Sequence, residues 1–526
     1  MAAFFLPPSA AARIGLPVFG GLGIAALAAL LLSGGSLLWV ALALGAGFVL
    51  IPSLVVSDAL TYWLCCFLLT LPFDVTKTFM NSDRLIALVQ QLGGPWGPPA
   101  LSVHVMDLAL LPLFGVWLVR KIARQERLWF PRISYLPLAF LCFTTLTAAV
   151  APSKYLAFLA LIELWKYFAI YLFAADALDV RRLGKPILAI LLLTLLMQGS
   201  LTLVRYRLQY FEPLFGETFG RIPAKVLGEA EGTRNVATDE AGSLQRGFGT
   251  FYHANPTAMH LELLLPFALA LALSSRWRRW KLLYAFVFAV GAGGLYVTFS
   301  RAGLVAFGVS SAVCVLVAAA RGVIPRRALV LLVGIGLFAG LCLLPLLAAY
   351  MGSRPEYSTA HVEHLRQGMA IALRHPLFGV GLNNSSAVRP FIVPQDLTYE
   401  DSQLPIHSGH LQVLAETGVI GFGLYVGFFL LVAIEAFRHL KAEDVYTRVF
   451  ALGTLGAYTA MCVHVTTDYV GVDAFHAMLW LYAGLIVASR RWEQIRPRGA
   501  QGVRHRQAGF GAARRAPIIA STVPHW

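Results

Sequence analysis

The segment from Arg366 to Gly418 contains the side chains of this sequence that are best suited to chemistry. Most of the chain consists of long apolar runs, whereas this segment is polar and interrupted by glycines. His407 lies within it and is the candidate general base, because a histidine titrates near neutral pH and can take a proton from an attacking hydroxyl. A short amphipathic helix is predicted over 366–373, and a second helix is predicted from near His407 to Gly418.

Helix starts predict where an anion would bind. Three apolar spans that run in the same direction begin at polar pairs, namely Asn255-Pro256, Ser300-Arg301 and His407-Ser408. Such residues are favoured at helix starts, where free N–H groups and the positive end of the helix dipole face outward. A cation at a helix start needs a counter-charge, so Arg301 indicates an anion held by arginine and helix N-termini together, and a diphosphate fits. Arg246, shortly before Asn255, is expected on the same face.

The order of these residues resembles the signature of the O-antigen ligase and surface polysaccharide polymerase superfamily, whose members are membrane glycosyltransferases that act on lipid-linked glycans. In that family an Arg precedes hPlfGvG, and a His-Asn/Ser pair follows, with a Leu and a Gly further on. The corresponding residues here are Arg366, the run 375–381, His407-Ser408, Leu411 and Gly418. Two more family patterns, R-x-x-Gly-Thr-Phe…Asn and Thr-x-Ser-Arg-Gly/Ala, match at 246–255 and 298–302. The resemblance covers residues 245–480 approximately.

The resemblance implies roles for individual residues and a GT-C-like fold. Arg301 and Arg366 correspond to the family's essential arginines. His407 corresponds to its essential histidine, and Asp468 to its late acidic residue. Contacts to the diphosphate or the glycan are then expected from the neighbouring polar residues, namely Arg246, Asn255, Ser300 and Ser408. Ser408 stands where Asn is commoner in the family, and both residue types cap helices.

Composition predicts an all-α polytopic membrane protein. The chain has 526 residues, of which 58% are hydrophobic and 13% charged, and its apolar runs repeat at the length of about 20 residues that crosses a bilayer. About 12–14 transmembrane helices with large periplasmic loops are expected. The net charge of +15 comes mostly from short loops and the tail, which indicates anionic lipid headgroups instead of nucleic acid. The six cysteines form no disulfide or zinc pattern.

Lys and Arg in alternate short loops predict the topology, because basic loops remain in the cytoplasm. Both ends of the chain are then cytoplasmic, and the N-terminus is expected to be an uncleaved first span. The predicted division is N-terminal transmembrane helices over 1–204, a periplasmic loop over 205–256, central transmembrane helices over 257–350, a large periplasmic loop with the catalytic motif over 351–410, C-terminal transmembrane helices over 411–489, and a basic cytoplasmic tail over 490–526 that is expected to be disordered.

Each candidate residue also has a purely structural interpretation. Arg301 and Arg366 could be interfacial anchors, and His407 could be a neutral helix cap. His407 and His410 share one helical face, as a metal-binding pair would, but no third ligand has a convincing spacing, so no metal is predicted.

Charged residues inside the predicted spans are a separate group. Glu163 and Lys166 are interpreted as a buried ion pair that fixes helix packing, in preference to a substrate contact. His104 and Asp107 are interpreted as the start of the fourth span.

The predicted function is transfer of a glycan from undecaprenyl diphosphate to an acceptor hydroxyl on the periplasmic side of the bacterial inner membrane, in surface polysaccharide or O-antigen assembly. Arginines would stabilise the diphosphate leaving group and His407 would deprotonate the acceptor. Neither metal, nucleotide sugar nor other cofactor is expected. Membrane lipids are expected partners, and nucleic acid is not.

Two alternatives remain open at this point. The acceptor is another lipid-linked glycan in a polymerase and lipid A–core in a ligase; the long outer loops favour the polymerase slightly. A flippase or other transporter of lipid-linked glycans is the alternative from another class. It would show charged or broken helices near mid-membrane in corresponding halves of the chain, whereas no internal repeat is visible in this sequence.

Overall fold

The computed structural model describes the helical bundle and the helices that lie across one of its ends. The residues described are 58–73, 76–78, 102–209, 246–251, 253–275, 277–337, 341, 355–392, 406–469 and 472–494. The apolar runs over 14–33 and 37–57, each of a length that predicts a span, and the basic tail beyond 494 lie outside them. Most of residues 74–99, which connect two predicted spans, and most of the predicted periplasmic loop over 205–256 also lie outside them. For these parts the sequence interpretation stays a prediction.

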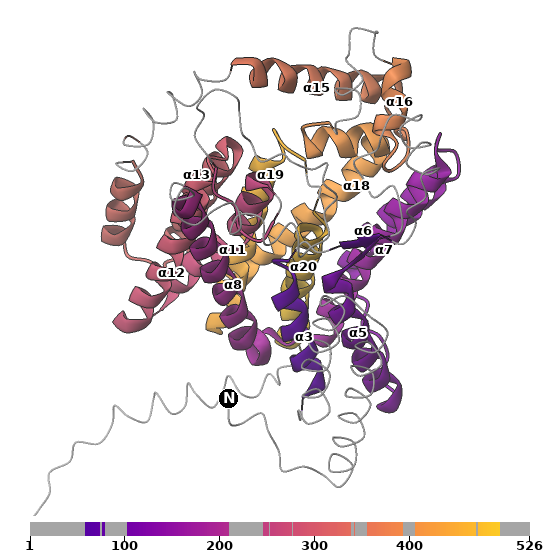
Figure 1. Ribbon diagram of the computed structural model, residues 1–526. Coiled ribbons are helices and arrows are strands. Elements are labelled where there is room, and N and C mark those ends of the chain that lie inside the picture. The colour runs from indigo at the N-terminus through magenta and orange to yellow at the C-terminus, as the bar shows by residue number, and fades with distance from the viewer. Residues whose placement is uncertain are drawn as a thin grey trace, which may run out of the picture.

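Helices make up nearly all of the described chain (Figure 1). The first half contains α3 (Ala59–Thr70), β1 (Thr76–Thr78), β2 (Ser102–His104), α5 (Val105–Ala123), η2 (Arg132–Ser134), α6 (Tyr135–Ala148), α7 (Lys154–Ala177) and α8 (Val180–Gln209). The second half contains α11 (Ala254–Ser274), α12 (Arg278–Val297), α13 (Arg301–Ala320), α15 (Pro355–Arg374), α16 (Ser385–Ile392), α18 (Gly409–His439), α19 (Val445–His464) and α20 (Asp473–Gln494).

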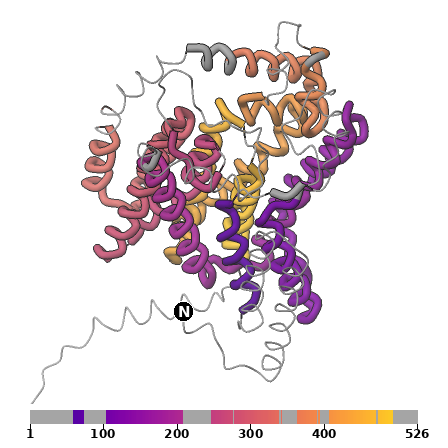
Figure 2. Tube along the Cα trace, in the orientation of Figure 1, coloured from indigo at the N-terminus to yellow at the C-terminus, as the bar shows by residue number. Residues whose placement is uncertain are grey.

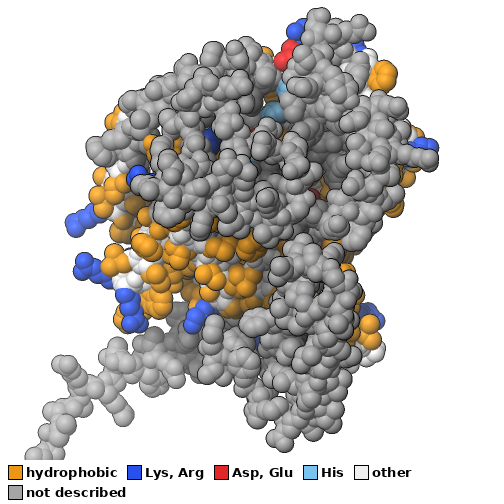
Figure 3. All heavy atoms as spheres, viewed as in Figure 1, with side chains coloured by type: hydrophobic (Ala, Val, Ile, Leu, Met, Phe, Trp, Pro, Cys, Tyr) orange, Lys and Arg blue, Asp and Glu red, His pale blue; other side chains and the backbone are white. Residues whose placement is uncertain are grey.

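The described helices form an all-α polytopic membrane protein, as predicted. Six of them are long and apolar enough to cross a membrane, namely α7, α8, α11, α12, α13 and α18. Helices α3, α5, α6, α19 and α20 agree to within a few residues with the apolar runs over 58–73, 100–121, 134–151, 448–467 and 474–489, which were predicted as further spans. Figure 3 shows hydrophobic side chains over the described flank of the bundle, with Lys and Arg along the lower border of that band. The total of about 12–14 spans stays a prediction.

Helix α11 lies in the middle of the bundle. In the most apolar 18-residue stretch of this helix, 83% of the residues are buried. The helix packs against α8, α12, α13 and α19. The Phe267 ring, for example, lies 5.7 Å from the Phe450 ring of α19 and 4.8 Å from the Tyr482 ring of α20. Polar side chains on α11 therefore lie in a protein-enclosed environment, where a hydrogen bond or an ion pair is stronger than in water.

The polar segment after residue 350 contains a longer helix than the sequence predicted. We expected a short helix over 366–373, whereas α15 begins at Pro355 and runs to Arg374. Proline is well suited to a first helical position, because it has no N–H that would be left without a partner there. Figures 1 and 2 show α15 lying across the end of the bundle beside the start of α18, and it packs against α18.

Candidate functional site

His407 lies in the turn that leads into α18, next to the connection between α19 and α20. Ser408 is the N-cap of α18, as predicted, and its Oγ accepts a hydrogen bond from the Leu411 N–H at 3.4 Å. The Gly409 N–H donates to the carbonyl oxygen of Asp468 at 2.9 Å. This bond holds the start of α18 against the α19–α20 connection, so that two predicted site residues, far apart in sequence, become neighbours.

A second histidine contacts His407. The Nδ1 atom of His364, on α15, lies 2.6 Å from Nδ1 of His407. Their ring centroids are 4.5 Å apart, with an angle of 63° between the ring planes. The Tyr469 ring lies on another side of His407, at 6.0 Å. His364 is buried and His407 is half-buried.

Asp468 is joined to the predicted substrate contacts by a chain of hydrogen bonds. Nδ2 of Asn255 donates to Asp468 Oδ2 at 2.8 Å. Arg246 donates through Nη2 to Oδ1 of Asn255 and through Nε to the carbonyl oxygen of Thr298, the latter at 2.7 Å. The prediction that Asn255 starts helix α11 was wrong, since His253 is the N-cap and its Nδ1 accepts the Asn255 N–H at 3.2 Å. The Asn255 side chain is thereby left to bridge Arg246 and Asp468.

Below this chain, a buried glutamate and a buried histidine connect α11 and α19. The Nδ1 atom of His464 lies 2.9 and 3.0 Å from the two carboxylate oxygens of Glu262. On the other side of the same ring, Nε2 lies 3.6 Å from Asp468 Oδ2. Both Glu262 and His464 are almost completely buried. The His464 ring therefore lies between two carboxylates, with one ring nitrogen facing each of them.

The polar contacts shift the pKa values of residues at this end of the bundle. Burial raises the pKa of Asp468, but the interactions with His464 and with the Tyr469 N–H, together with the proximity of His407, outweigh burial, and the pKa lies below its ordinary value. Burial and, after it, the charge of Arg246 lower the pKa of His253 to about 4. His253 is thus neutral at pH 7, as its role as acceptor for the Asn255 N–H requires.

Arg301 is the first residue of α13, and this helix begins beside the chain of hydrogen bonds that joins Arg246, Asn255 and Asp468. Ser300 is the N-cap, and its Oγ accepts the Gly303 N–H at 3.2 Å. The Ser300 N–H donates to Oγ1 of Thr298 at 3.2 Å, and the carbonyl of Thr298 is the group that Arg246 binds. The predicted helix start at Ser300-Arg301 is therefore confirmed, and it lies next to Arg246.

Arg366 is on α15, two residues after His364, and it points away from the chain of polar contacts. Its side chain is 82% exposed, and Nη1 forms an ion pair with Glu363 at 3.9 Å. Sequence reasoning expected Arg366 beside Arg301 at a shared anion site. In this structure Arg366 lies on the same end of the bundle, but its exposed guanidinium is directed to solvent.

The two glycines in the family signature join the α15 segment to α18. Gly379 and Gly418 both have positive φ, of 68° and 62°, and Gly418 interrupts the helical geometry of α18, as predicted. A Cβ on Gly379 would lie 2.3 Å from the Glu416 backbone, and one on Gly418 would lie 2.3 Å from the Leu377 backbone. Three main-chain hydrogen bonds cross the contact, from Val380 N–H to Ala415 O at 3.1 Å, from Gly381 N–H to Glu416 O at 2.9 Å and from Val419 N–H to Pro376 O at 2.8 Å.

We call residues 376–381 and 415–419, joined in this way, the glycine clamp. A non-glycine residue at either position would combine a disfavoured backbone conformation with a steric clash. The clamp and a hydrophobic cluster that includes Ile371, Ile406 and Leu411 fix α15 on the start of α18. The glycines of the signature thus have a structural role, which is to place α15 over His407.

A second group of ionisable side chains lies between α5, α7 and α20. Lys166 pairs with Glu163, as predicted, and also with Asp107 at 3.4 Å and Asp473 at 3.5 Å. Nε2 of His104 lies 2.5 Å from Asp473. The ligand atoms of His104, Glu163 and Asp473 are close enough together to suit a metal ion. Lys166 already supplies positive charge to all three carboxylates, so we interpret the group as an ion-pair network that fixes three helices.

His407 and His410 contact different parts of the fold. Nε2 of His410 lies 3.0 Å from the carbonyl oxygen of Cys462, whereas His407 contacts His364. The two rings therefore bond to different elements of the fold, α19 for His410 and α15 for His407.

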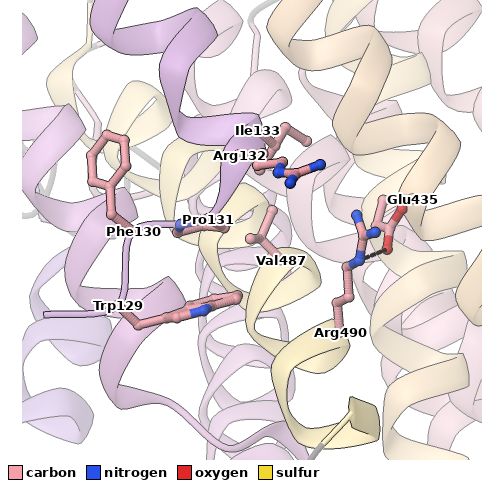
Figure 4. A pocket seen from close by; sticks show the side chains of 8 residues that line it. All are labelled: Trp129, Phe130, Pro131, Arg132, Ile133, Glu435, Val487 and Arg490. Carbon is pink, nitrogen blue, oxygen red and sulfur yellow. Dashed lines mark ion pairs between the residues drawn. The ribbon is translucent and has the colours of Figure 1, made fainter. Parts of the chain in front are cut away.

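A cavity of about 390 Å³ lies at the other end of the bundle (Figure 4). It is lined by Trp129, Phe130, Pro131, Arg132, Ile133, Glu435, Val487 and Arg490. Glu435 and Arg490 form an ion pair at 3.7 Å, and they lie near the ends of α18 and α20, whose starts are beside His407 and Asp468. The cavity is therefore separated from the candidate site by the length of these helices.

Sequence analysis missed three residues of the site. Glu262 and His464 lie inside apolar spans, and an ionisable residue in such a span is itself a signal of function. His364 lies in a segment that was interpreted as a loop, and its approach to His407 depends on the glycine clamp. No spacing rule in the sequence connects those two histidines.

Comparison with known proteins supports the resemblance. Residues 285–426 match the family described as O-Antigen ligase; this range includes Arg301, Arg366, the glycine clamp and His407. No curated protein matches the chain. Five chains of solved structures match, one of them from a structure described as "Structural coordination of polymerization and crosslinking by a peptidoglycan synthase complex". That chain is 18% identical in sequence to this one, and the match covers 68% of this chain and 96% of that chain, with a TM-score of 0.35.

Proposed function

We propose that this chain, whose residues 285–426 match the O-antigen ligase family, is a glycosyltransferase. It moves a glycan from a polyprenyl diphosphate to an acceptor hydroxyl. The carrier is undecaprenyl diphosphate, and the reaction takes place on the periplasmic side of the bacterial inner membrane. Both chain termini are cytoplasmic. A reporter enzyme fused after residue 380 should report periplasm, and one fused after residue 500 should report cytoplasm; both reporters on one side would contradict this topology.

The observation that carries the proposal is the convergence of a histidine, a carboxylate and two arginine-bearing segments at one end of the bundle. The starts of α11, α13 and α18 meet there, around Asp468, Asn255 and Arg246. Helix N-termini and arginines provide positive potential for a diphosphate. A histidine provides a base for the attacking hydroxyl.

The reaction is a single displacement. The acceptor oxygen forms a bond to the anomeric carbon while the bond from that carbon to the diphosphate oxygen breaks. The hydroxyl proton passes to His407, and the diphosphate leaves with the bonding electrons, stabilised by Arg301 and by Arg246. Arg366 is exposed on α15 at the same end of the bundle, where its charge adds to the positive potential for the diphosphate. Direct attack inverts the anomeric configuration.

The acceptor is a second lipid-linked glycan, so that the protein acts as a polymerase. Helix α15, which lies across the end of the bundle, and α16 beside it offer surface for two glycans. A ligase that uses lipid A–core would have the same catalytic residues. Incubation with lipid-linked repeat units alone distinguishes the two, because only a polymerase lengthens the glycan without added lipid A–core.

The test uses purified protein in nanodiscs with lipid-linked glycan and with EDTA present throughout. His407→Ala, His407→Gln and His407→Asn should bind donor yet transfer about 10²–10⁴-fold more slowly, which is the usual contribution of a positioned base. His410→Ala should keep most activity, because His410 bonds to the Cys462 carbonyl. Near-normal transfer by His407→Ala would refute the assignment of the base. Loss of activity in EDTA, restored by a divalent ion, would show that a metal is needed.

A further inference from the structure

The contact between His364 and His407 has a chemical consequence for any reaction in which His407 is the base. Two Nδ1 atoms at 2.6 Å share one proton, since a hydrogen bond needs one donor and one acceptor. If His407 donates from Nδ1, its Nε2 carries no hydrogen and can take a proton. If His364 donates, Nε2 of His407 carries the hydrogen and cannot act as a base.

We propose that His364 is the positioning residue of His407, accepting the hydrogen bond from its Nδ1–H and so keeping Nε2 of His407 as the base. This inference rests on the proposed function, since it concerns the same proton transfer. When Nε2 takes the acceptor proton, a charge-assisted hydrogen bond to neutral His364 stabilises the new positive charge of His407. An orienting partner of this kind fixes both the tautomer and the ring position of a catalytic histidine.

The surroundings of the pair support a fixed geometry. His364 is only 3% exposed. Helix α15 is held on the start of α18 by the glycine clamp and by the hydrophobic cluster around Ile371 and Ile406. Asp468, which often would be the partner of such a histidine, instead accepts from Asn255 and faces His464. Its negative charge still favours the protonated form of His407.

Asparagine and leucine form a matched pair of substitutions at position 364. They have nearly the same shape, and the Asn Oδ1 can take the place of the imidazole Nδ1 as acceptor, whereas Leu offers no acceptor. His364→Leu should lower kcat by about 10²-fold or more, within the range of a general base, with little change in KM for the donor. His364→Asn should regain most of that loss. Val362→Ala, at an exposed position of the same helix, is the control for the integrity of α15.

A double-mutant cycle with His407→Ala separates the inference from the proposed function. If His364 acts through His407, His364→Leu causes no further loss of transfer in the His407→Ala background. A further loss there as large as in the wild type, or equal losses in His364→Leu and His364→Asn, would overturn the positioning role. Normal transfer by His407→Ala would refute the proposed role of His407 itself. Normal transfer by His364→Leu, with His407→Ala inactive, would refute only the positioning role of His364.

Discussion

The buried pair of Glu262 and His464 makes a quantitative prediction. His464→Leu leaves the carboxylate of Glu262 buried without its nearest partner, which lies 2.9 Å away in the wild type. Removal of one member of a buried ion pair costs about 3–5 kcal/mol of unfolding free energy, because the other charge remains desolvated. Glu262→Leu should cost a similar amount. The double substitution should be more stable than either single one, since leucines can fill a buried site without leaving a charge.

Stability and activity should respond differently in this set of variants. In the double variant Asp468 has lost His464, which lies 3.6 Å from its carboxylate. An interaction with a charged group is worth about 1.5–3 kcal/mol, so glycan transfer should fall about 10- to 100-fold even where stability has recovered. The free energies are measured by equilibrium unfolding in mixed detergent micelles, and transfer is measured in nanodiscs.

Ser310→Ala is the control for loss of a neutral buried bond between helices. Its Oγ donates to the Gly456 carbonyl at 2.8 Å, and its loss should cost about 0.5–1.5 kcal/mol. Additive effects of Glu262→Leu and His464→Leu would refute the reasoning, because they would show that the two charges do not stabilise each other. A fully active double variant would show that His464 does not support Asp468.

Three further predictions concern the same end of the bundle. Arg301→Ala should abolish transfer while the protein still inserts, and Arg301→Lys should recover only part of it because the planar fork of donors is lost; full activity of the lysine variant would mean that a generic cation suffices. Gly379→Ala should destabilise the protein by at least about 1–2 kcal/mol through its positive φ alone and should lower transfer by displacing α15; normal melting and transfer would contradict the clamp. The low pKa of Asp468 means that its contribution to stability is complete above its ordinary value of 3.8 and is lost as the pH falls through the lower folded-state value. Unfolding free energy measured below pH 4 should therefore fall less steeply for Asp468→Asn than for the wild type, and equal slopes would refute this.

The sequence contained enough information for the helices and for much of the site. Apolar runs of about 20 residues give each span a strong signal of its length, and the described helices other than α15 and α16 coincide with the predicted spans. Ser300 and Ser408 were predicted as helix caps from residue type, and both accept the expected N–H groups. Asn255 and Asp468 were both candidate site residues in the sequence, and their side chains are hydrogen-bonded to each other.

Contacts between elements could not be predicted in the same way. The pairing of Glu262 with His464 depends on how α11 rotates against α19, and an apolar run gives no signal of that rotation. The bond between His364 and His407 depends on α15 folding back over α18, which the glycine clamp enforces through backbone atoms. Arg366 points outward because it lies on the face of α15 opposite the buried His364. This could not be predicted, because the short helix predicted from the sequence did not include His364.

The glycine clamp also bears on how proteins of this type could diversify. It is built from main-chain hydrogen bonds and two glycines, so it places no demand on the other side chains of α15. A segment attached in this way can accumulate substitutions on its exposed face while its packing on α18 stays the same. Chimeras that keep Gly379, Gly418, His364, Arg366 and Ile371 and take the other exposed positions of residues 362–374 from a relative are therefore expected to fold, with a new surface presented to the acceptor and the same catalytic residues below it.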